Sequence, residues 1–472
     1  MRESDDCPPS WPANSRKVGQ VADLPYLLRG ELAVARDEPF CQKSRMRFPL
    51  RLVFAAGALL AASLASAKTL IYAGALIDGR ADTARKAVTV TVDGDRITGI
   101  ADGYTTAGTG DTVIDLKNAT VLPGLMDMHV HLDGQQSPES YTEGFYLNPG
   151  DYALRSAFYA KKTLLAGFTT VRNLGDTNYS TRSLRKAIAA GWVEGPRVYT
   201  AGPAIGTTGS HADGTNGYSD QVIRAFAEPE IFNGADGARA AVRDHVKHGA
   251  DVIKIMTTGG VLSLGDSAQG AQMTSEEVKA VVETAHEYGL KVAVHAHGTE
   301  GMKRAILAGV DSIEHGTFMT EEIVALMKEH GTYYVPTLSA GNFVMEKARV
   351  PGFLPPSVAA KALLVGPAMT ATFQRAYQAG VKIAFGTDQG VAPHGDNAKE
   401  FIYMVNAGMK PMDAIKTSTL EASKLLGVEK DLGTVEAGKF ADLIAVPGDP
   451  LADIKLMTQV SFVMKAGKVY KQ

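Results

Sequence analysis

The stretch VLPGLMDMHVHL, residues 121–132, carries the most information about the fold and the chemistry of this chain. Its apolar residues predict a buried strand over 121–130 that ends in a His-x-His pair. Side chains two residues apart in a strand lie on the same face, so His129 and His131 point the same way. Neutral imidazoles placed side by side suit a divalent metal ion, although an isolated His-x-His pair is only weak evidence for one.

Further apolar segments follow this strand at regular intervals, and helical patterns, such as 275–288 and 301–308, separate many of them. Such alternation favours a parallel α/β fold, and eight strands over this length predict a (β/α)8 TIM-type barrel over 121–430. An open doubly wound sheet is the alternative, but no G-x-G-x-x-G motif follows a first strand. The other predicted strands are 169–173, 198–201, 252–256, 292–295, 312–314, 333–336 and 383–386.

Both ends of the chain outside this barrel have a different pattern. Residues 68–120 form short β-type runs broken by Gly-Asp turns, and 92–95 (Val-Asp-Gly-Asp) is typical of a hairpin turn. Residues 431–472 resume the same style with apolar runs at 440–446, 461–465 and 467–470. These segments predict one small β domain assembled from both ends.

Catalytic residues of a barrel of this type lie at the carboxyl ends of its strands. Five of the eight predicted strands end in, or contain, side chains that can bind a metal. Each has an ordinary explanation when taken alone, such as a hydrogen-bonded core histidine or a helix-capping aspartate. Their coincidence predicts a metal site. The side chains are the pair His129 and His131, Lys254, the pair His295 and His297, His315, and Asp388.

Lys254 is the least expected member of this set because it interrupts an apolar strand. It shares a strand face with Val252 and Met256, and on the barrel-lumen face an ammonium group would be buried at high cost without a partner. Burial lowers the pKa of a lysine, and a neutral amine can react with CO₂ to give an anionic carbamate. Alternatively, the side chain extends to the strand end and reaches water.

Two loops on the same side of the predicted barrel are candidates for substrate contacts. The Gly- and Asp-rich loop 206–237 contains His211, which we expect to point into the site, unless the loop is simply solvated. After Lys254, Gly259 and Gly260 offer backbone N–H groups that could bind a substrate carboxylate, or form an ordinary turn.

Motifs along the whole length after residue 67 are similar to those of one known superfamily. They are PGLMDMHVHL, KIMTTGGV, VAVHAHG, IEHG, GTD and, near the C-terminus, LGTVEAGKFADLIAV. The chain resembles the metal-dependent amidohydrolases, in the branch that contains imidazolonepropionase-like enzymes and Xaa-Pro dipeptidases. The resemblance implies a barrel flanked by a small β-sandwich, made from 68–120 and 431–472. It also implies a large symmetric homo-oligomer, such as an octamer.

The resemblance further implies a site with two divalent metal ions, usually zinc. His129, His131 and Asp388 would hold one ion, His295 and His315 the other, and carboxylated Lys254 would bridge them together with a hydroxide. Two adjacent metals lower the pKa of a bridging water and polarise a scissile carbonyl. Asp388 would accept the proton and pass it to the leaving amine. His297 would donate a hydrogen bond to the substrate, or only pack against a ligand.

Several substrates remain open. The first interpretation is hydrolysis of linear amide bonds in dipeptides or N-acyl amino acids, including conversion of ochratoxin A to ochratoxin α and L-phenylalanine, because exported bacterial members of the branch cleave that toxin. The second is a cyclic-amide hydrolase of the hydantoinase, dihydroorotase or imidazolonepropionase type. True imidazolonepropionases lack the bridging lysine, so Lys254 weighs against that activity. The third is a metal-binding protein without catalysis.

The N-terminal region predicts export. Residues 46–67 (MRFPLRLVFAAGALLAASLASA) have a positive start, an apolar run too short for a membrane span and a small-residue cleavage site, which is typical of a signal peptide. Residues 1–45 then read as an over-extended start of translation, and the mature protein would be periplasmic or secreted, free of the membrane. Both cysteines, Cys7 and Cys41, lie before the signal peptide.

The charge of the chain excludes one class of partner. It has 472 residues with 48 Lys and Arg against 51 Asp and Glu, a net charge of −3. Without a basic surface field, a nucleic-acid partner is excluded. We therefore expect a small-molecule amide or dipeptide as the substrate.

Overall fold

A computed structural model describes residues 67–225, 230–264 and 267–472. The predicted over-extended start, 1–45, and the predicted signal peptide, except for Ala67, lie outside the described residues. No helix in the described ranges is long and apolar enough to cross a bilayer.

Strands from both ends of the described chain share one mixed sheet. Its strand order is β16-β15-β14-β4-β1-β2-β3, and β4 pairs antiparallel with β14. The predicted hairpin is present, because Asp93 pairs with Arg96 and Gly94 takes the turn at φ +58°. The strands are β1 Thr69–Leu76, β2 Arg85–Asp93, β3 Arg96–Asp102, β4 Thr112–Pro123, β14 Leu443–Pro447, β15 Phe462–Lys465 and β16 Lys468–Lys471.

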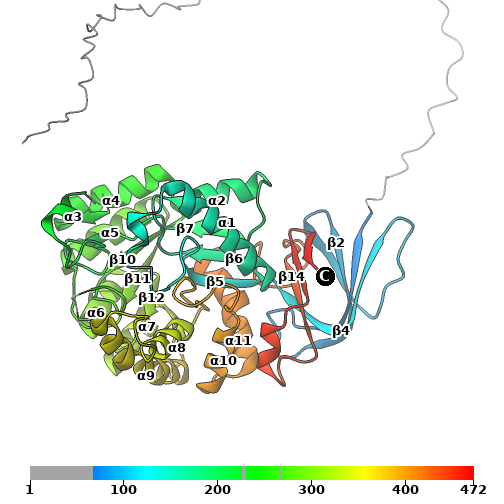
Figure 1. The fold of residues 1–472 in the computed structure, drawn as a ribbon. Helices are drawn as coiled ribbons and strands as arrows, with labels where there is room; N and C mark the ends of the chain where they lie inside the picture. Colours follow the sequence, from blue (N-terminus) through cyan, green and yellow to red (C-terminus); the bar gives the residue numbers. More distant parts are fainter. Residues whose placement is uncertain (1–66, 226–229, 265–266) are drawn as a thin grey trace, which may run out of the picture. The chain divides into compact units, whose positions relative to one another are not determined.

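Two parallel sheets lie among the helices, as Figure 1 shows. One has the order β5-β6-β7 and the other β10-β11-β12-β13, and each strand pairs in parallel with its neighbour. This is the TIM-barrel-type α/β arrangement that the alternating pattern predicts. The strands are β5 Leu125–Val130, β6 Phe168–Asn173, β7 Arg197–Thr200, β10 Val252–Met256, β11 Lys291–Ala296, β12 Ser312–His315 and β13 Tyr333–Val335.

Helices follow most of these strands and cover their outer side. The long ones are α1 Pro149–Leu165, α2 Ser180–Ala189, α4 Gly234–His248, α5 Ser275–Glu287, α6 Thr299–Ala308, α7 Glu321–His330, α8 Leu338–Lys347, α9 Pro356–Gln378 and α10 Lys399–Asn406. The shorter elements are η1 Glu143–Phe145, β8 Gly206–Thr207, α3 Asp220–Ala225, β9 Ile231–Phe232, α11 Pro411–Lys416, η2 Thr417–Glu421, α12 Ala422–Leu426 and η3 Ile454–Thr458.

Backbone hydrogen bonds also run between the two parallel sheets. The N–H of Asp251, before β10, donates to the carbonyl of Thr200 in β7, and that of Ile205 donates to the carbonyl of Lys254. On the far side, Ala384 donates to Tyr334 of β13, and Met128 of β5 donates to Phe385. The segment 383–389 thus lies between β13 and β5.

Two sequence expectations need correction here. The predicted strand 121–130 is two strands, because Val121–Pro123 end β4 and pair with β14, whereas β5 begins at Leu125 after Gly124. Val121–Pro123 therefore pair within the seven-stranded sheet. The predicted eighth strand, 383–386, is not a regular strand and has an isolated bridge from Ile383 to Tyr334.

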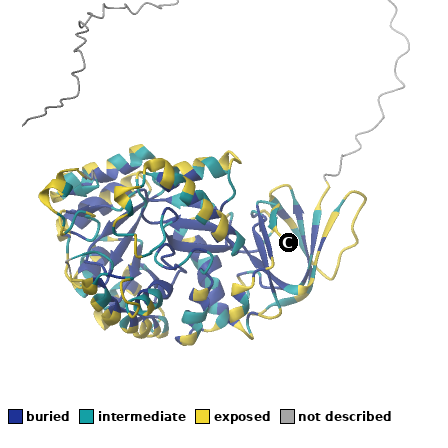
Figure 2. Ribbon diagram, viewed as in Figure 1, coloured by how far each residue is buried: buried dark blue, intermediate teal, exposed yellow. Residues whose placement is uncertain are grey.

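The strands are the most buried part of the molecule. Every residue of β5, β6, β10 and β12 is buried, and Figure 2 shows the inner strands dark blue and the outward helix faces yellow. Strands buried on both faces read as continuous apolar runs, so a polar residue within one is conspicuous. Arg172, Lys254 and Glu314 are the charged side chains that these four strands bury besides Asp127.

Candidate active site

Six of the predicted side chains converge at the carboxyl ends of the strands. The rings of His129 and His315 lie 5.1 Å apart between centroids, and those of His295 and His315 lie 4.6 Å apart. His131 lies 5.4 Å from His129, and both approach Asp388. Residues separated by some 260 positions in the chain therefore form one cluster.

One ring nitrogen of each of four histidines is held by a group outside the cluster. Such a bond fixes the orientation of an imidazole and leaves its other nitrogen for a ligand, as is usual for metal-binding histidines. The bonds are His129 Nδ1 to Glu314 Oε2 (3.0 Å), His131 Nδ1 to the Gly175 carbonyl (3.0 Å), His315 Nδ1 to Thr337 Oγ1 (2.7 Å) and His295 Nε2 to the Gly259 carbonyl (3.2 Å).

His129, His295 and His315 are neutral near pH 7, which is the state that binds metal. Burial lowers the pKa of His129 to about 4, with a further contribution from Lys254. The pKa values of His295 and His315 also lie well below the usual value, again mainly through burial. His131 differs, because its hydrogen bond to Asp388 outweighs burial and raises its pKa.

Asp388 closes the cluster from the segment that follows the irregular eighth strand. Its Oδ1 lies 3.2 Å from His131 Nε2 and 3.5 Å from His129 Nε2. Burial alone would raise the pKa of this carboxyl, but the adjacent His129 and His131 outweigh burial and lower it. Asp388 is therefore ionised and available as a ligand or a proton acceptor.

Lys254 lies at the base of the cluster in the barrel interior. Its side chain is 1% exposed, and among the described residues its Nζ has no hydrogen-bond partner. Burial lowers its pKa to about 8, although the carboxylates of Glu314 and Asp388 oppose the shift. The alternative in which Lys254 extends to water is therefore wrong.

These observations fit a metal centre. Donor atoms of His129, His315 and Asp388 lie within 4.8 Å of one another, close enough to hold one ion. A buried amine without a partner is costly, and the cost disappears if the amine becomes a carbamate that binds cations. The donor set of imidazoles and carboxylate is the type that binds zinc and similar divalent ions.

His297 is placed beside this cluster rather than in it. Its ring stacks on that of His315 with centroids 5.1 Å apart, and its Nδ1 lies 2.6 Å from Thr317 Oγ1. Burial lowers its pKa to about 3, with a further contribution from His211. Its side chain lines the same cavity as the cluster, so a substrate can reach it.

The cavity over the cluster holds about 340 Å³ and has two kinds of wall. The histidines, Lys254 and Asp388 form its polar floor. Its apolar wall comes largely from α8, α9 and the loop after Asp388, through Ala340, Val344, Val365, Met369 and Val391. We call the space along this wall the inner chamber. A few polar groups in a mostly apolar cavity are typical of a small-molecule site.

Residues 120–470 match the Amidohydrolase family. The chain belongs to this family. It is therefore a hydrolase of a family that depends on metal ions, as the resemblance in the motifs implies.

Relatives of this amidohydrolase include an ochratoxinase and a Xaa-Pro dipeptidase. Ochratoxinase of Aspergillus niger is 35% identical over 437 residues, which cover 88% of this chain and 89% of ochratoxinase. A Xaa-Pro dipeptidase, with methionine bound in the active site of its crystal structure, is 50% identical with a TM-score of 0.83, covering 86% of this chain and all of that one. The crystal structure of A. niger ochratoxinase has a TM-score of 0.76 at 32% identity, covering 86% of this chain and 96% of that chain.

The two predicted loop contacts of the amidohydrolase have different outcomes. The ring of His211 lies 4.4 Å from that of His295 and lines the cavity, so the loop does bring it to the site. The N–H of Gly259, however, donates to the Gly270 carbonyl at 3.0 Å and is not available to a substrate carboxylate. The carbonyl of Gly260 accepts a bond from Lys361, and a Cβ at Gly260 would overlap the His211 ring, so this glycine provides room for His211.

Sequence reasoning missed the buried network beneath the cluster. Glu314 accepts a bond from Arg172 at 2.8 Å and is 3.0 Å from His129, and both charged groups are at most 1% exposed. Asp127 accepts bonds from the N–H groups of His129 and Thr387, and so joins β5 to the Asp388 segment. The signal that singled out Lys254, a charge inside an apolar strand, was present for Arg172 and Glu314 too.

Proposed function

We propose that this chain is a metal-dependent hydrolase of linear amide bonds in dipeptides and N-acyl amino acids. The observation that carries the proposal is the buried Nζ of Lys254, which has no hydrogen-bond partner among the described residues and lies beneath the histidine cluster and Asp388. A buried amine in that position is explained by carboxylation and metal binding, and a purely structural role does not account for it.

The proposed cofactors are two divalent ions, with zinc as the first choice, and N6-carboxylysine at Lys254. His129, His131 and Asp388 would hold one ion, and His295 and His315 the other. When bound, the ions supply an activated water and polarise the scissile carbonyl. The described contacts support a metal site, because one ring nitrogen of each histidine is held by a group outside the cluster.

The remaining chemistry belongs to side chains of the chain. Asp388, ionised and directed at the cluster, accepts a proton and delivers it to the nitrogen of the leaving amine. His297, held at Nδ1 by Thr317, directs its other nitrogen to the substrate and donates a hydrogen bond in its neutral form. The apolar walls keep bulk water away from both groups.

The proposed substrates release an apolar amino acid. The inner chamber is apolar, and the ochratoxinase and Xaa-Pro dipeptidase likenesses support amide substrates with an amino acid on the leaving side. Ochratoxin A, which would give ochratoxin α and L-phenylalanine, is the specific compound we propose. Lys254 continues to disfavour an imidazolonepropionase activity.

We also propose the architecture and setting around the site. Residues 121–430 would form a closed (β/α)8 barrel, supported by the hydrogen bonds of segment 383–389 to β13 and β5. Residues 68–120 and 431–472 would form a β-sandwich, supported by the sheet that joins both ends. The mature protein would act in the periplasm or outside the cell, as a homo-oligomer.

A substrate panel tests the activity. Purified, zinc-loaded protein should release free amino acid from N-acyl amino acids, dipeptides and ochratoxin A, and Asp388→Asn should lower kcat by at least about a hundredfold while the metal content falls less. Turnover of ring substrates alone, such as hydantoins, would show that the cyclic-amide alternative is correct. A metal-loaded protein that hydrolyses none of these amides would overturn the proposal.

A further inference from the structure

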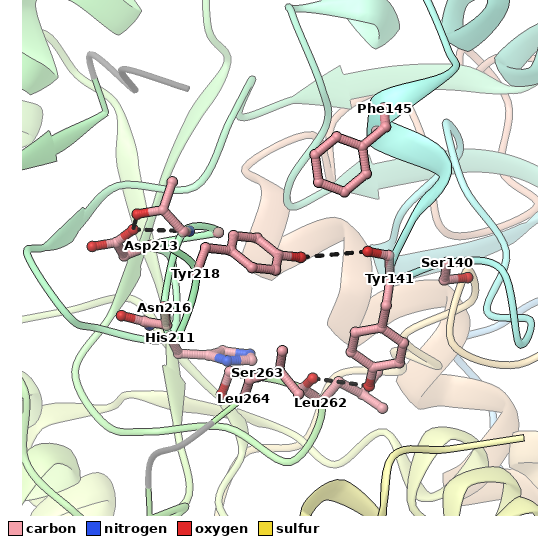
Figure 3. Close-up of a pocket in the computed structure, with 13 residues that line it drawn as sticks. Ser140, Tyr141, Phe145, His211, Asp213, Asn216, Tyr218, Leu262, Ser263 and Leu264 are labelled. Atoms are coloured by element: carbon pink, nitrogen blue, oxygen red, sulfur yellow. Dashed lines mark hydrogen bonds between the residues drawn. The ribbon is translucent and has the colours of Figure 1, made fainter. Parts of the chain in front are cut away.

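A second pocket opens beside the cavity that contains the histidine cluster (Figure 3). It holds about 370 Å³ and shares Ser140, His211 and Leu262 with the cavity. The two spaces are therefore contiguous, with His211 at their junction. We call this second space the aromatic pocket, because its walls include Tyr141, Phe145 and Tyr218.

Three loops on the catalytic side of the barrel contribute these walls, and two tyrosines join the loops. Tyr141 Oη donates to the carbonyl of Leu262 at 3.0 Å, and Tyr218 Oη donates to the carbonyl of Tyr141 at 3.4 Å. Figure 3 shows the Tyr218 ring extending across the pocket toward Tyr141, with the Phe145 ring above them in this view. Because their hydroxyl groups are bonded, the rings are held in place before a ligand arrives.

The walls favour a flat, apolar group. Phe145 and Tyr218 meet edge to face, with centroids 6.3 Å apart at 63°. Aromatic rings attract another planar ring in stacked or edge-to-face contact more strongly than they attract a saturated group of the same size. Leu262 and Leu264 add an aliphatic surface below the rings.

The charge of the aromatic pocket bears on which end of a substrate binds there. None of the described residues that line the aromatic pocket is Lys or Arg, and its carboxylate, Asp213, repels anions. Asp213 is held by its own loop, through Gly209 and Thr215. The carboxylate of a leaving amino acid is therefore disfavoured here, whereas an uncharged acyl group is not.

The side chains that line the two spaces support the same orientation of the substrate. The inner chamber is walled by buried side chains such as Val344, Val365 and Met369, which limit the size of the group that enters it. Phe145 at the aromatic pocket is 50% exposed, so a large acyl group can extend past this ring toward solvent.

We propose that the aromatic pocket binds a planar aryl group on the acyl side of the scissile amide, while the inner chamber binds the side chain of the released amino acid. Tyr218, Tyr141 and Phe145 are then specificity-determining residues for aryl-acyl amino acids. This assignment rests on the proposed function, since it places the amide bond at the histidine cluster between the two spaces.

Matched substrates with a common leaving group test the aryl preference. They are N-benzoyl-, N-cyclohexanecarbonyl- and N-acetyl-L-leucine, compared by kcat/KM. The wild type should prefer benzoyl to cyclohexanecarbonyl. Tyr218→Leu should lower kcat/KM for the benzoyl substrate by about fivefold or more and change that for the acetyl substrate less than about twofold. An equal loss for both, or no preference for the planar group, would overturn the proposal.

Two further variants control for folding and for position. If Tyr218→Leu does not fold, Phe145→Ala replaces it, because half of that ring is already exposed. Tyr146→Ala is the matched control, since Tyr146 is 78% exposed and follows Phe145 but does not line the pocket. It should leave the ratio of benzoyl to acetyl activity unchanged, and a change as large as that of Phe145→Ala would overturn the assignment.

A variant in the inner chamber tests the orientation of the substrate. Ala340→Val narrows the inner chamber, so it should lower kcat/KM for leucine substrates relative to alanine substrates, whichever acyl group they carry. If the loss of kcat/KM in Ala340→Val depended on the acyl group and not on the amino acid, the substrate would bind in the reverse orientation.

A binding experiment separates the pocket from the proposed function. If no N-acyl amino acid is hydrolysed, the proposed function fails, and benzamide, an uncharged aryl amide, then serves as the probe in calorimetry. Weaker benzamide binding by Tyr218→Leu than by Tyr146→Ala would support an aryl site. Equal binding by the two variants would overturn it.

Discussion

Three residues at the site have a left-handed backbone that their side chains normally avoid. His315 has φ +70°, Asp388 +58° and Thr337 +52°. His and Asp tolerate this region better than most residues, whereas a β-branched threonine does not. Such conformations cost about 1–3 kcal/mol each and persist where surrounding contacts hold them. Here the hydrogen bond between His315 and Thr337 joins two of the strained positions and fixes the ring.

The first prediction concerns Lys254. Lys254→Met keeps a side chain of similar length with an apolar stem, but this side chain cannot form a carbamate. We therefore expect loss of most bound metal and of at least about 99% of activity. Metal content by mass spectrometry and kcat on an N-acyl amino acid are the measurements. Retention of two metal ions per chain by the variant would contradict the bridging role.

The second prediction concerns the buried ion pair beneath the site. Arg172→Met leaves the Glu314 carboxylate without its guanidinium partner in a fully buried position. Removing one partner of a buried pair costs about 3–5 kcal/mol, and we expect this loss in the free energy of unfolding from urea titration. Arg239→Met, which breaks an exposed pair with Asp236, is the control and should change little. Similar results for the two variants would contradict a structural role for Arg172.

At the scale of elements, the segment 383–389 is the least regular part of the barrel and yet carries Asp388. It pairs with Tyr334 on one side and Val130 on the other through isolated bridges. Phe385 anchors it, with ring centroids 5.5 Å from Phe168 and 4.5 Å from Phe401. Packing by these rings thus compensates for the missing regular ladder.

The third prediction follows from this anchor. Phe385→Ala removes a fully buried ring and should lower the free energy of unfolding by about 3–5 kcal/mol. It should also weaken metal retention, because Asp388 lies three residues further on. Phe158→Ala, at a ring 59% exposed on α1, is the control that should leave both quantities unchanged. A destabilised Phe385→Ala protein with normal metal content would contradict the expectation that packing of the segment 383–389 supports the metal site.

The sequence predicts the regular elements well and the irregular ones poorly. Strands such as β10 and helices such as α5 have strong apolar periodicity, so the predicted limits agree with the observed ones within a residue or two. The eighth strand could not be predicted as irregular, because Ile383–Ala384–Phe385 looks like any buried strand and only tertiary contacts break its ladder.

For the candidate site, too, the sequence predicts some features and not others. Alternation within a strand predicts which histidines face together, and the structure brings them together. The bond from Gly259 to Gly270 could not be predicted, because it depends on how a loop folds back. The pairing of Arg172 with Glu314 is a contact between β6 and β12 that local pattern does not reveal. The metal-binding and catalytic roles themselves stay predictions.

At the scale of the molecule, polar contacts join the seven-stranded sheet to the barrel. Arg197 of β7 forms an ion pair with Asp442, and its guanidinium lies 4.5 Å from the centroid of the Phe440 ring. Lys465 of β15 is buried and donates to the carbonyl of Gly195. Burial of Lys465, followed by repulsion from Arg197, lowers its pKa to about 8.

The fourth prediction is a pH dependence of stability. Below about pH 8, Lys465 is charged in both the folded and the unfolded state, and its burial destabilises the fold. Between about pH 8 and 10.5 the folded protein releases this proton while the unfolded chain keeps it, so stability rises with pH by at most about 3 kcal/mol. Lys465→Met lacks this rise. The measurement is the difference in unfolding free energy between wild type and variant at pH 7.5 and 10, and a constant difference would contradict it.

The fifth prediction concerns export. A gene that begins at Met46 should deliver the protein to the periplasm, with a mature chain that starts at Lys68. N-terminal sequencing of the periplasmic fraction is the measurement. Retention of residues 46–67 on the active protein, or an active pool confined to the cytoplasm, would show that the segment is not a cleaved signal.

The pairing of β4 with β14 also bears on how the polypeptide is made. Synthesis runs from the N-terminus, so β4 has no neighbour on that edge until some 320 further residues have been added. An exposed strand edge invites association with other chains. A ribosome that stalls before codon 443 would therefore release a product in which one edge of β4 is unpaired and exposed to other chains. Completing this sheet therefore requires the whole message.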